Sequence, residues 1–234
     1  CGKTQILTER VRRAHDAGIA YTDMLCLTFT NRAARGMQER IAGYIADEAL
    51  ALLYVGNIHR FCSRYLFEHH IVASGSAIID DDDALSILAR YLEEDENRVK
   101  ESLYRRQSYA EMIHFSHFMH QIAHGHPRHL RLHPECLTSE DIAAMKYICQ
   151  IQHKEFTAEQ MTDMYEHVDF YRDATRTADY DMGIQASIQR LLTKMRFAHA
   201  YTAYCRQNKL LDFEDLLLLT YDALTAPDAD IHRY

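Results

Sequence analysis

The sequence predicts an α/β fold that is mostly helical, with a partial parallel sheet and a large all-helical insert. Three observations support this class. Short runs rich in β-forming residues alternate with helical patterns up to residue 72, the order that builds a parallel sheet. Helical spacing of apolar residues then fills residues 80–205. The chain of 234 residues contains only eight Gly and three Pro, which favours long helices over tight turns.

The first part of the chain reads as helix, strand, helix, strand, helix. Apolar spacing predicts a helix over residues 4–17. The runs MLCLTFT (24–30) and LYVGNI (53–58) predict buried strands. Thr30 or Asn31 is a suitable N-cap for the helix after the first run, because its side-chain oxygen can accept a free N–H. This order predicts βα units in a parallel sheet, with a further strand expected before residue 1.

The central part of the chain predicts helices and no strand. Its helical segments are residues 80–94, 109–123, 139–151, 157–171 and 184–207. A last apolar helix is expected over residues 210–224, capped by Asp212. The predicted domains are therefore one formed by residues 1–79 and 206–234, and a helical insert formed by residues 80–205.

Composition limits the class of protein. No apolar run approaches the roughly 20 residues that a membrane span needs, and no signal peptide is visible. The formal net charge is −8, so any nucleic-acid binding has to be local. The scattered cysteines favour reduced thiols and a cytoplasmic protein; they are Cys1, Cys26, Cys62, Cys136, Cys149 and Cys205.

The opening CGKT has the form of the end of a phosphate-binding loop and stands directly before a predicted helix. Backbone N–H groups at such a helix start bind phosphates. Lys3 would place an ammonium on the β- and γ-phosphates, and Thr4 would hold Mg²⁺. The predicted catalytic residues are Lys3 and Thr4, and the predicted nucleotide-binding residues are Gly2, Lys3, Thr4 and Gln5.

Two strand ends carry a second set of candidates. In α/β sheets, ligands bind at the carboxyl ends of the strands. A helix start with Arg32 suits a phosphodiester backbone, Phe29 can stack on a base, and His59 can contact either. The predicted DNA-binding residues are Thr28, Phe29, Thr30, Asn31, Arg32, Asn57 and His59.

Four segments, in this order, resemble the N-terminal half of the UvrD/Rep-like superfamily 1 DNA helicases: GKTQILTERV, LTFTNRAARGMQERI, GNIHRFCSRYL and LLDFEDLLLL. They correspond to the end of motif I, motif Ia, motif Ib and the D-F-D-D-L segment. The resemblance implies a partial RecA-like domain 1A with a helical domain 1B. It also implies ATP and Mg²⁺ as cofactors, and 3′-to-5′ movement on single-stranded and partially duplex DNA, in repair or recombination.

The sequence departs from the family pattern in several places. Asn57-Ile58 stands where the family usually has Thr-Phe before the histidine, and Gly36 lies inside a predicted helix. We expect the first half of the phosphate loop to precede Cys1 and the acidic Walker B segment to follow Tyr234. The isolated chain is therefore expected to lack the ATPase activity of the parent enzyme.

Residues 114–133 are rich in histidine. His114, His117, His120 and His124 are spaced three, three and four residues apart, which can align them on one helical face. His120 and His124 have a spacing compatible with zinc, with Cys136 as a further candidate ligand. A polar or DNA-facing stripe of histidines is the favoured interpretation, and a metal site is the alternative.

Three other functional interpretations remain open. The parent can be a helicase–nuclease subunit of the AddA type, which shares these motifs. A non-motor P-loop kinase with a helical lid explains Gly2-Lys3-Thr4 but not the two strand ends. A helical interaction module predicts no effect of nucleotide or DNA.

Overall fold

The computed structural model describes residues 3–175 and 182–227 of the chain. The chain forms two compact units. The sheet unit comprises the residues up to Ser74 together with those from Leu219 onward, and the helical unit comprises Gly75–Leu218. The division between Leu218 and Leu219 falls within helix α12 (Phe213–Thr225).

The sheet unit alternates helices and strands along the chain, as the sequence predicted. Its N-terminal elements are α1 (Lys3–Asp16), the 3₁₀ turn η1 (Tyr21–Asp23), β1 (Leu25–Thr28), α2 (Asn31–Ile41), α3 (Asp47–Leu50), β2 (Tyr54–Asn57) and α4 (Ile58–Glu68). Both strands are shorter than the apolar runs that predicted them.

Strands β1 and β2 pair in parallel, which confirms the predicted sheet type. Leu25 lies opposite Tyr54, and Thr28 lies opposite Asn57. Side chains alternate between the two faces of a strand. Cys26 of β1 therefore lies in the core of this unit, while the residues on either side of it in the strand do not. The buried members of this core are Val11, Tyr21, Cys26, Met37, Ile41, Leu53 and Val55.

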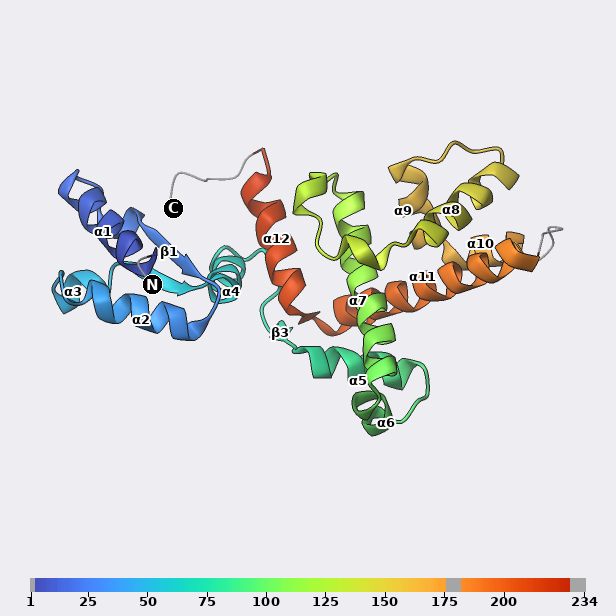
Figure 1. Cartoon of the computed structure of the whole chain (residues 1–234), viewed down its shortest axis with the longest axis horizontal. Coiled ribbons are helices and arrows are strands. Elements are labelled where there is room, and N and C mark those ends of the chain that lie inside the picture. Colours follow the sequence, from blue (N-terminus) through green and yellow to red (C-terminus); the bar gives the residue numbers. More distant parts are fainter. Residues whose placement is uncertain (1–2, 176–181, 228–234) are drawn as a thin grey trace. The chain divides into compact units, whose positions relative to one another are not determined.

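The helical unit consists mainly of helices. Its elements are β3 (Ala77–Ile78), α5 (Asp81–Tyr91), α6 (Glu96–Glu101), α7 (Leu103–Ala123), the 3₁₀ turns η2 (Arg128–Leu130) and η3 (Pro134–Cys136), α8 (Ser139–Ile151), α9 (Ala158–Glu166), α10 (Val168–Thr175), α11 (Met182–Asn208), β4 (Leu210–Leu211) and the start of α12 (Phe213–Thr225). The long helices α7 and α11 pack against one another and cross in Figure 1.

Two apolar clusters fill the helical unit. The larger one joins α7, α8, α9, α10 and α11 around fully buried side chains such as Ile148, Met164 and Leu191. The smaller one joins α5, α6, α7 and α11 around Leu88 and Val99. Because α7 and α11 contribute to both clusters, they form the frame on which the shorter helices pack.

Three local predictions need correction. The segment 157–171 is two helices, because α9 ends before His167 and α10 begins after it. Helix α12 begins at Phe213 rather than at residue 210, since Leu210–Leu211 form β4. Strand β4 pairs in parallel with β3, and neither strand was expected.

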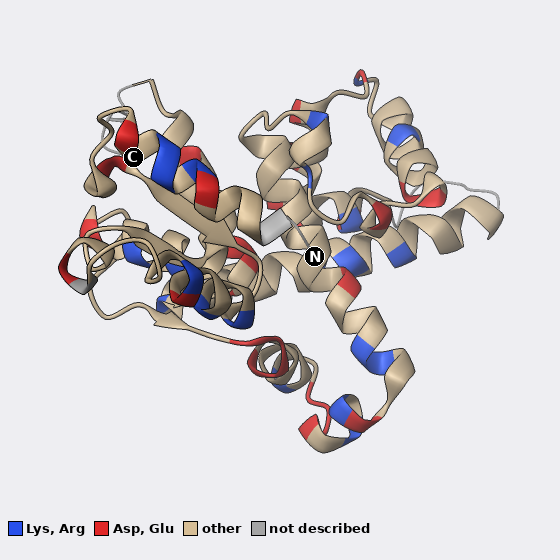
Figure 2. Cartoon of the chain, turned by 60° about the vertical axis from the view of Figure 1, so that its left-hand side comes forward, with Lys and Arg blue, Asp and Glu red and all other residues tan. Residues whose placement is uncertain are grey.

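Two predicted N-caps are confirmed. Thr30 caps α2 by accepting the N–H of Ala33. Asp212 Oδ1 accepts the N–H of Asp215 at 2.9 Å at the start of α12. Acidic residues gather at the start of α5, where Asp80 is the N-cap, while acidic and basic residues are interspersed elsewhere on the ribbon (Figure 2). Among the described residues, no helix is both long and apolar enough to cross a membrane.

Candidate functional site

The end of the phosphate loop leads into α1. Helix α1 begins at Lys3, so the Gly-Lys-Thr sequence does stand at a helix start. Gly2 and the side chains of Lys3 and Thr4 lie outside what the structure describes, and Gln5 is exposed in the first turn. The assignment of these residues to a nucleotide stays a prediction.

The second candidate site lies where β1 and β2 end, side by side. Their last residues, Thr28 and Asn57, face each other in the parallel register. Helix α2 begins at Asn31, three residues after Thr28, and α4 begins at Ile58, directly after Asn57. The predicted DNA-binding residues of the two motifs therefore meet at one edge of the sheet, which we call the strand-end edge and define as Thr28–Arg32 and Asn57–Arg60.

Hydrogen bonds fix the backbone of the strand-end edge. The Thr28 hydroxyl donates to the carbonyl of Thr30 at 3.0 Å. Asn57 Oδ1 accepts the N–H of Arg60 at 2.7 Å and so caps α4. Asn57 Nδ2 donates to Asn31 Oδ1, also at 2.7 Å, and this bond joins the two motifs. The sequence indicated Asn57 as a contact residue, but it gave no sign of this bridge.

The strand-end edge exposes an aromatic ring between polar groups. Phe29 is 89% exposed, which is unusual for Phe and excludes a role in the core. Asn31 and Arg32 are exposed, and His59 is half-buried. Arg60 is also exposed at the start of α4 and adds a cation that was not among the predicted contacts.

The electrostatics of the strand-end edge favour an anion. Neither α2 nor α4 has an acidic residue in its first turn. Each helix start leaves backbone N–H groups that its own turns do not use, and the helix dipole makes that end positive. Although the chain carries a net charge of −8, this edge presents two positive helix ends together with Arg32 and Arg60.

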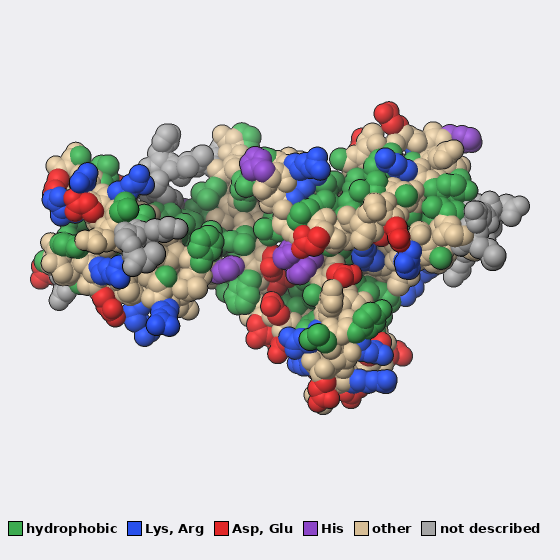
Figure 3. Space-filling view, viewed as in Figure 1, with side chains coloured by type: hydrophobic (Ala, Val, Ile, Leu, Met, Phe, Trp, Pro, Cys, Tyr) green, Lys and Arg blue, Asp and Glu red, His purple; other side chains and the backbone are tan. Residues whose placement is uncertain are grey.

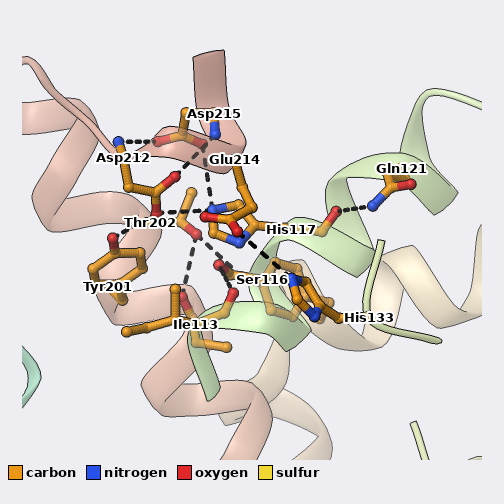
Figure 4. Close-up of polar contacts among 12 residues, drawn as sticks. Ile113, Ser116, His117, Gln121, His133, Tyr201, Thr202, Asp212, Glu214 and Asp215 are labelled. Atoms are coloured by element: carbon orange, nitrogen blue, oxygen red, sulfur yellow. Dashed lines mark hydrogen bonds and ion pairs between the residues drawn. The ribbon is translucent and has the colours of Figure 1, made fainter. Parts of the chain in front are cut away.

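The histidines of the helical unit do not form the surface stripe that spacing suggested. His117 is only 3% exposed, and its Nε2 lies 2.9 Å from Asp212 Oδ2 and 3.6 Å from Asp215 Oδ1 (Figure 4). The ring N–H is not well aligned with either carboxylate, so these contacts are ion pairs rather than good hydrogen bonds. Tyr201 donates a hydrogen bond to the same carboxylate of Asp212 at 2.7 Å.

Two other histidines lie beside this buried pair. The rings of His114 and His133 stack with their centroids 3.5 Å apart and their planes 1° from parallel. His133 Nε2 lies 3.6 Å from Glu214 Oε1, and its Nδ1 lies 3.3 Å from Glu135 Oε1. We call His114, His117, His133, Asp212, Glu214 and Asp215 the acid–histidine cluster.

The charges in the acid–histidine cluster follow from burial and pairing. Burial opposes the positive charge of His117, but Asp212 and Asp215 outweigh it and raise its pKa to about 9. Burial and the neighbouring His133 lower the pKa of His114 to about 4, so this ring is neutral at pH 7. Burial and the charge of Asp212 raise the pKa of Asp215 to about 6.

The zinc ligands suggested by spacing are not brought together as a set. The rings of His120 and His124 do stack, with centroids 4.0 Å apart. Cys136, however, is buried in the larger apolar cluster of the helical unit, and burial raises the pKa of its thiol to about 12. Such a thiol stays protonated, which disfavours metal binding.

Parallel strands followed by helices place the sheet unit among the α/β proteins. In such proteins ligands bind at the carboxyl ends of the strands. A family model described as the UvrD/REP helicase N-terminal domain matches residues 1–234. The chain therefore belongs to the UvrD/REP helicase family, as its N-terminal domain.

Individual relatives match over shorter stretches. The ATP-dependent DNA helicase UvrD1 of Mycobacterium bovis is 34% identical over 92 residues, which cover 37% of this chain and 12% of that protein. The ATP-dependent DNA helicase PcrA of Leuconostoc citreum is 36% identical over 66 residues, which cover 28% of this chain and 9% of that protein. The matched stretches thus span about a tenth of the length of these relatives.

Proposed function

We propose that this chain is part of an ATP-dependent DNA helicase that moves 3′-to-5′ on single-stranded DNA and unwinds partially duplex DNA in repair or recombination. Its sheet unit is the first part of a RecA-like motor domain. Lys3 and Thr4 act on ATP and Mg²⁺, with Gly2 and Gln5 beside the nucleotide. The strand-end edge binds the DNA strand. Membership of the UvrD/REP family supports each of these assignments.

The observation that carries the proposal is the exposed ring of Phe29 between two capped helix starts. A Phe that is 89% exposed loses the free energy of burial, so a ligand that covers it gains that free energy back. Stacking of a base on an aromatic ring contributes about 1–3 kcal/mol and accepts every base. This chemistry favours a single strand, whose bases are accessible, over a closed duplex.

The helix starts supply the phosphate contacts. Successive phosphates along an extended strand need positive groups that are spaced along the protein surface. The starts of α2 and α4 lie at the ends of neighbouring strands, which are about 4.8 Å apart in a sheet. The bond between Asn57 and Asn31 holds the two starts in register. Such an arrangement suits a backbone that runs across the strand ends.

A binding titration tests the proposal. Phe29→Ala in the 234-residue chain should weaken binding to a fluorescent single-stranded oligonucleotide by roughly tenfold or more, since a stacking contact of about 1–3 kcal/mol is lost. Arg32→Ala should lower the dependence of log K on log [salt] by roughly one, because it removes one phosphate contact.

Tyr44→Ala is the matched control, because Tyr44 is an exposed aromatic residue of the same unit that lies outside the strand-end edge. Its affinity for the oligonucleotide should equal that of the unsubstituted chain. Equal losses in Phe29→Ala and Tyr44→Ala, or no loss in Phe29→Ala, would contradict the DNA assignment.

A further inference from the structure

The acid–histidine cluster combines side chains from three separate segments of the helical unit. Helix α7 supplies His114 and His117, the N-cap of η3 supplies His133, and the start of α12 supplies Asp212 and Glu214. Figure 4 shows His117, His133 and Glu214 turned toward one another between these segments. On the face drawn in Figure 3, histidine and acidic side chains lie next to one another near α7.

The members of the cluster divide into two groups. The first group is the buried His117 with Asp212 at 2.9 Å and Asp215 at 3.6 Å, whose charges compensate that of the ring. His114, His133 and Glu214 are half-buried, and each offers a ligand atom within 4.8 Å of the other two. Glu214 also lies within this range of His117 and Asp212, but the charges of His117 and Asp212 already compensate each other. The second group is therefore the one with ligand capacity.

The second group resembles a metal site in its outer contacts as well. A histidine that binds a metal usually directs its other ring nitrogen to a carboxylate or carbonyl, which fixes the ring. His133 does so, since its Nδ1 lies 3.3 Å from Glu135 while its Nε2 lies 3.6 Å from Glu214. The backbone of His133 is left-handed, with φ of 49°, and this turn brings the ring over His114.

A cavity of about 360 Å³ reaches the site. His114 and Glu214 line it together with Asp81, Asp212 and Arg106. Asp212 is compensated by His117, and Arg106 pairs with Asp82 at 3.1 Å. Asp81 and Glu214 still give the wall an excess of negative charge, which attracts a cation. An ion entering from this side meets His114 and Glu214 directly.

We propose that His114, His133 and Glu214 bind a divalent transition-metal ion, and that zinc is the ion that suits them best. Two imidazoles and one carboxylate are a ligand set that zinc accepts and that magnesium and calcium disfavour. Ligand atoms around tetrahedral zinc lie roughly 3.3 Å apart, so binding closes the present group slightly and tilts the stacked rings. The inference does not depend on the proposed helicase function.

The bound ion would tie α7, the loop before η3 and the start of α12 together. The loop is already held to α7 by the hydrogen bond from the N–H of Leu132 to Gln121 Oε1 at 3.0 Å. The ion would chiefly add a link from α7 and this loop to the start of α12, which comes much later in the sequence. The site leaves at least one coordination position toward the cavity, which water can occupy.

Calorimetry and cobalt absorption test the proposal on the 234-residue chain after chelator treatment. Zn²⁺ should bind with one high-affinity equivalent per chain, and Co²⁺ should give the absorption of a site with imidazole and carboxylate ligands. The variants His114→Ala, His133→Asn and Glu214→Gln should each lower the affinity for Zn²⁺ at least tenfold. Asn is chosen at position 133 because it tolerates the left-handed backbone.

His129→Asn is the matched control, since His129 is exposed on the neighbouring 3₁₀ turn and lies outside the ligand group. It should bind Zn²⁺ like the unsubstituted chain. Circular dichroism checks that each variant folds. If a histidine variant does not fold, the Zn²⁺ affinity of Glu214→Gln, a substitution at a half-buried position, decides whether the site exists. Absence of saturable Zn²⁺ binding, or unchanged affinity in the folded Glu214→Gln variant, would overturn the proposal.

Discussion

Asn57 uses both ends of its amide at the strand-end edge. Its oxygen caps α4, and its nitrogen donates to Asn31 at the start of the neighbouring helix. The sequence showed Asn57-Ile58 where the family usually has Thr-Phe. The structure shows that Asn57 provides a polar link between the two motifs.

Two substitutions separate these roles of Asn57. Asn57→Ala removes the cap and the bridge, and it should lower the free energy of unfolding by about 0.5–2 kcal/mol and weaken binding to single-stranded DNA. Asn57→Asp keeps a capping oxygen but loses the donor and adds a negative charge beside the DNA path. It should leave stability nearly unchanged while it weakens DNA binding, as measured by urea unfolding and oligonucleotide titration. Wild-type affinity in Asn57→Asp would show that no phosphate approaches this residue.

Individual residues also show where sequence analysis reaches its limit. The spacing of His114, His117, His120 and His124 predicted one helical face. The first three lie on α7 and His124 is its C-cap, but His117 is buried. Spacing alone gave no sign that His117 faces Asp212, because that pairing depends on how α12 approaches α7. A helix with a buried histidine and a helix with an exposed stripe of histidines have the same sequence pattern. The two can be distinguished only when the partner carboxylate is known.

At the scale of helices and strands, the strongest local signals gave the best predictions. Helices α1, α2, α4, α7, α8 and α11 follow apolar periodicity, and Thr30 and Asp212 are caps of the expected type. The sequence did not predict strands β3 and β4, because a strand of two residues is too short to show a periodic pattern. The sequence did not predict the break between α9 and α10, because the helical spacing of apolar residues continues across it.

Gly36 and Gly18 are a matched pair of glycines, one inside helix α2 and one just after helix α1. A Cβ atom at either position meets no other atom within 4 Å. Gly36 lies inside α2 with an ordinary helical backbone, so Gly36→Ala should stabilise the chain by about 0.5–1 kcal/mol. Gly18 has φ of 93° and ends α1, where its N–H bonds to the carbonyl of His15 at 2.9 Å.

Gly18→Ala should destabilise the chain by about 1 kcal/mol, because a side chain strains this left-handed backbone. Urea midpoints of the two variants and the unsubstituted chain give the comparison. A Gly36→Ala variant that unfolds at lower urea than the unsubstituted chain would mean that α2 needs glycine for another reason.

At the scale of the whole molecule, the two units have separate apolar cores. The core of the sheet unit shares no residue with the two clusters of the helical unit. The helical unit is thus expected to fold when it is excised. A segment of residues 75–225 should show a helical circular dichroism spectrum and one cooperative unfolding transition in urea.

A shorter segment of residues 75–207 is the control for this experiment. It lacks β4, Asp212 and the start of α12, so His117 loses the carboxylate that compensates its buried charge. Loss of one partner of a buried ion pair costs about 3–5 kcal/mol. The shorter segment should therefore unfold at much lower urea, and equal midpoints would rule out this role for Asp212.

The small sheet formed by β3 and β4 has a consequence for the order of events during protein synthesis. Ala77 pairs with Leu210 and Ile78 with Leu211. Strand β3, near the start of the helical unit, therefore cannot pair until β4, near the end of this unit, has been synthesised. Chains emerge from the ribosome N-terminal end first. The nascent unit therefore carries His117 without its carboxylate until Asp212 follows β4 out of the ribosome. The pairing of β3 with β4 and the contact of His117 with Asp212 thus become possible within a few residues of synthesis. We therefore expect the helical unit to complete its fold in one step, late in synthesis.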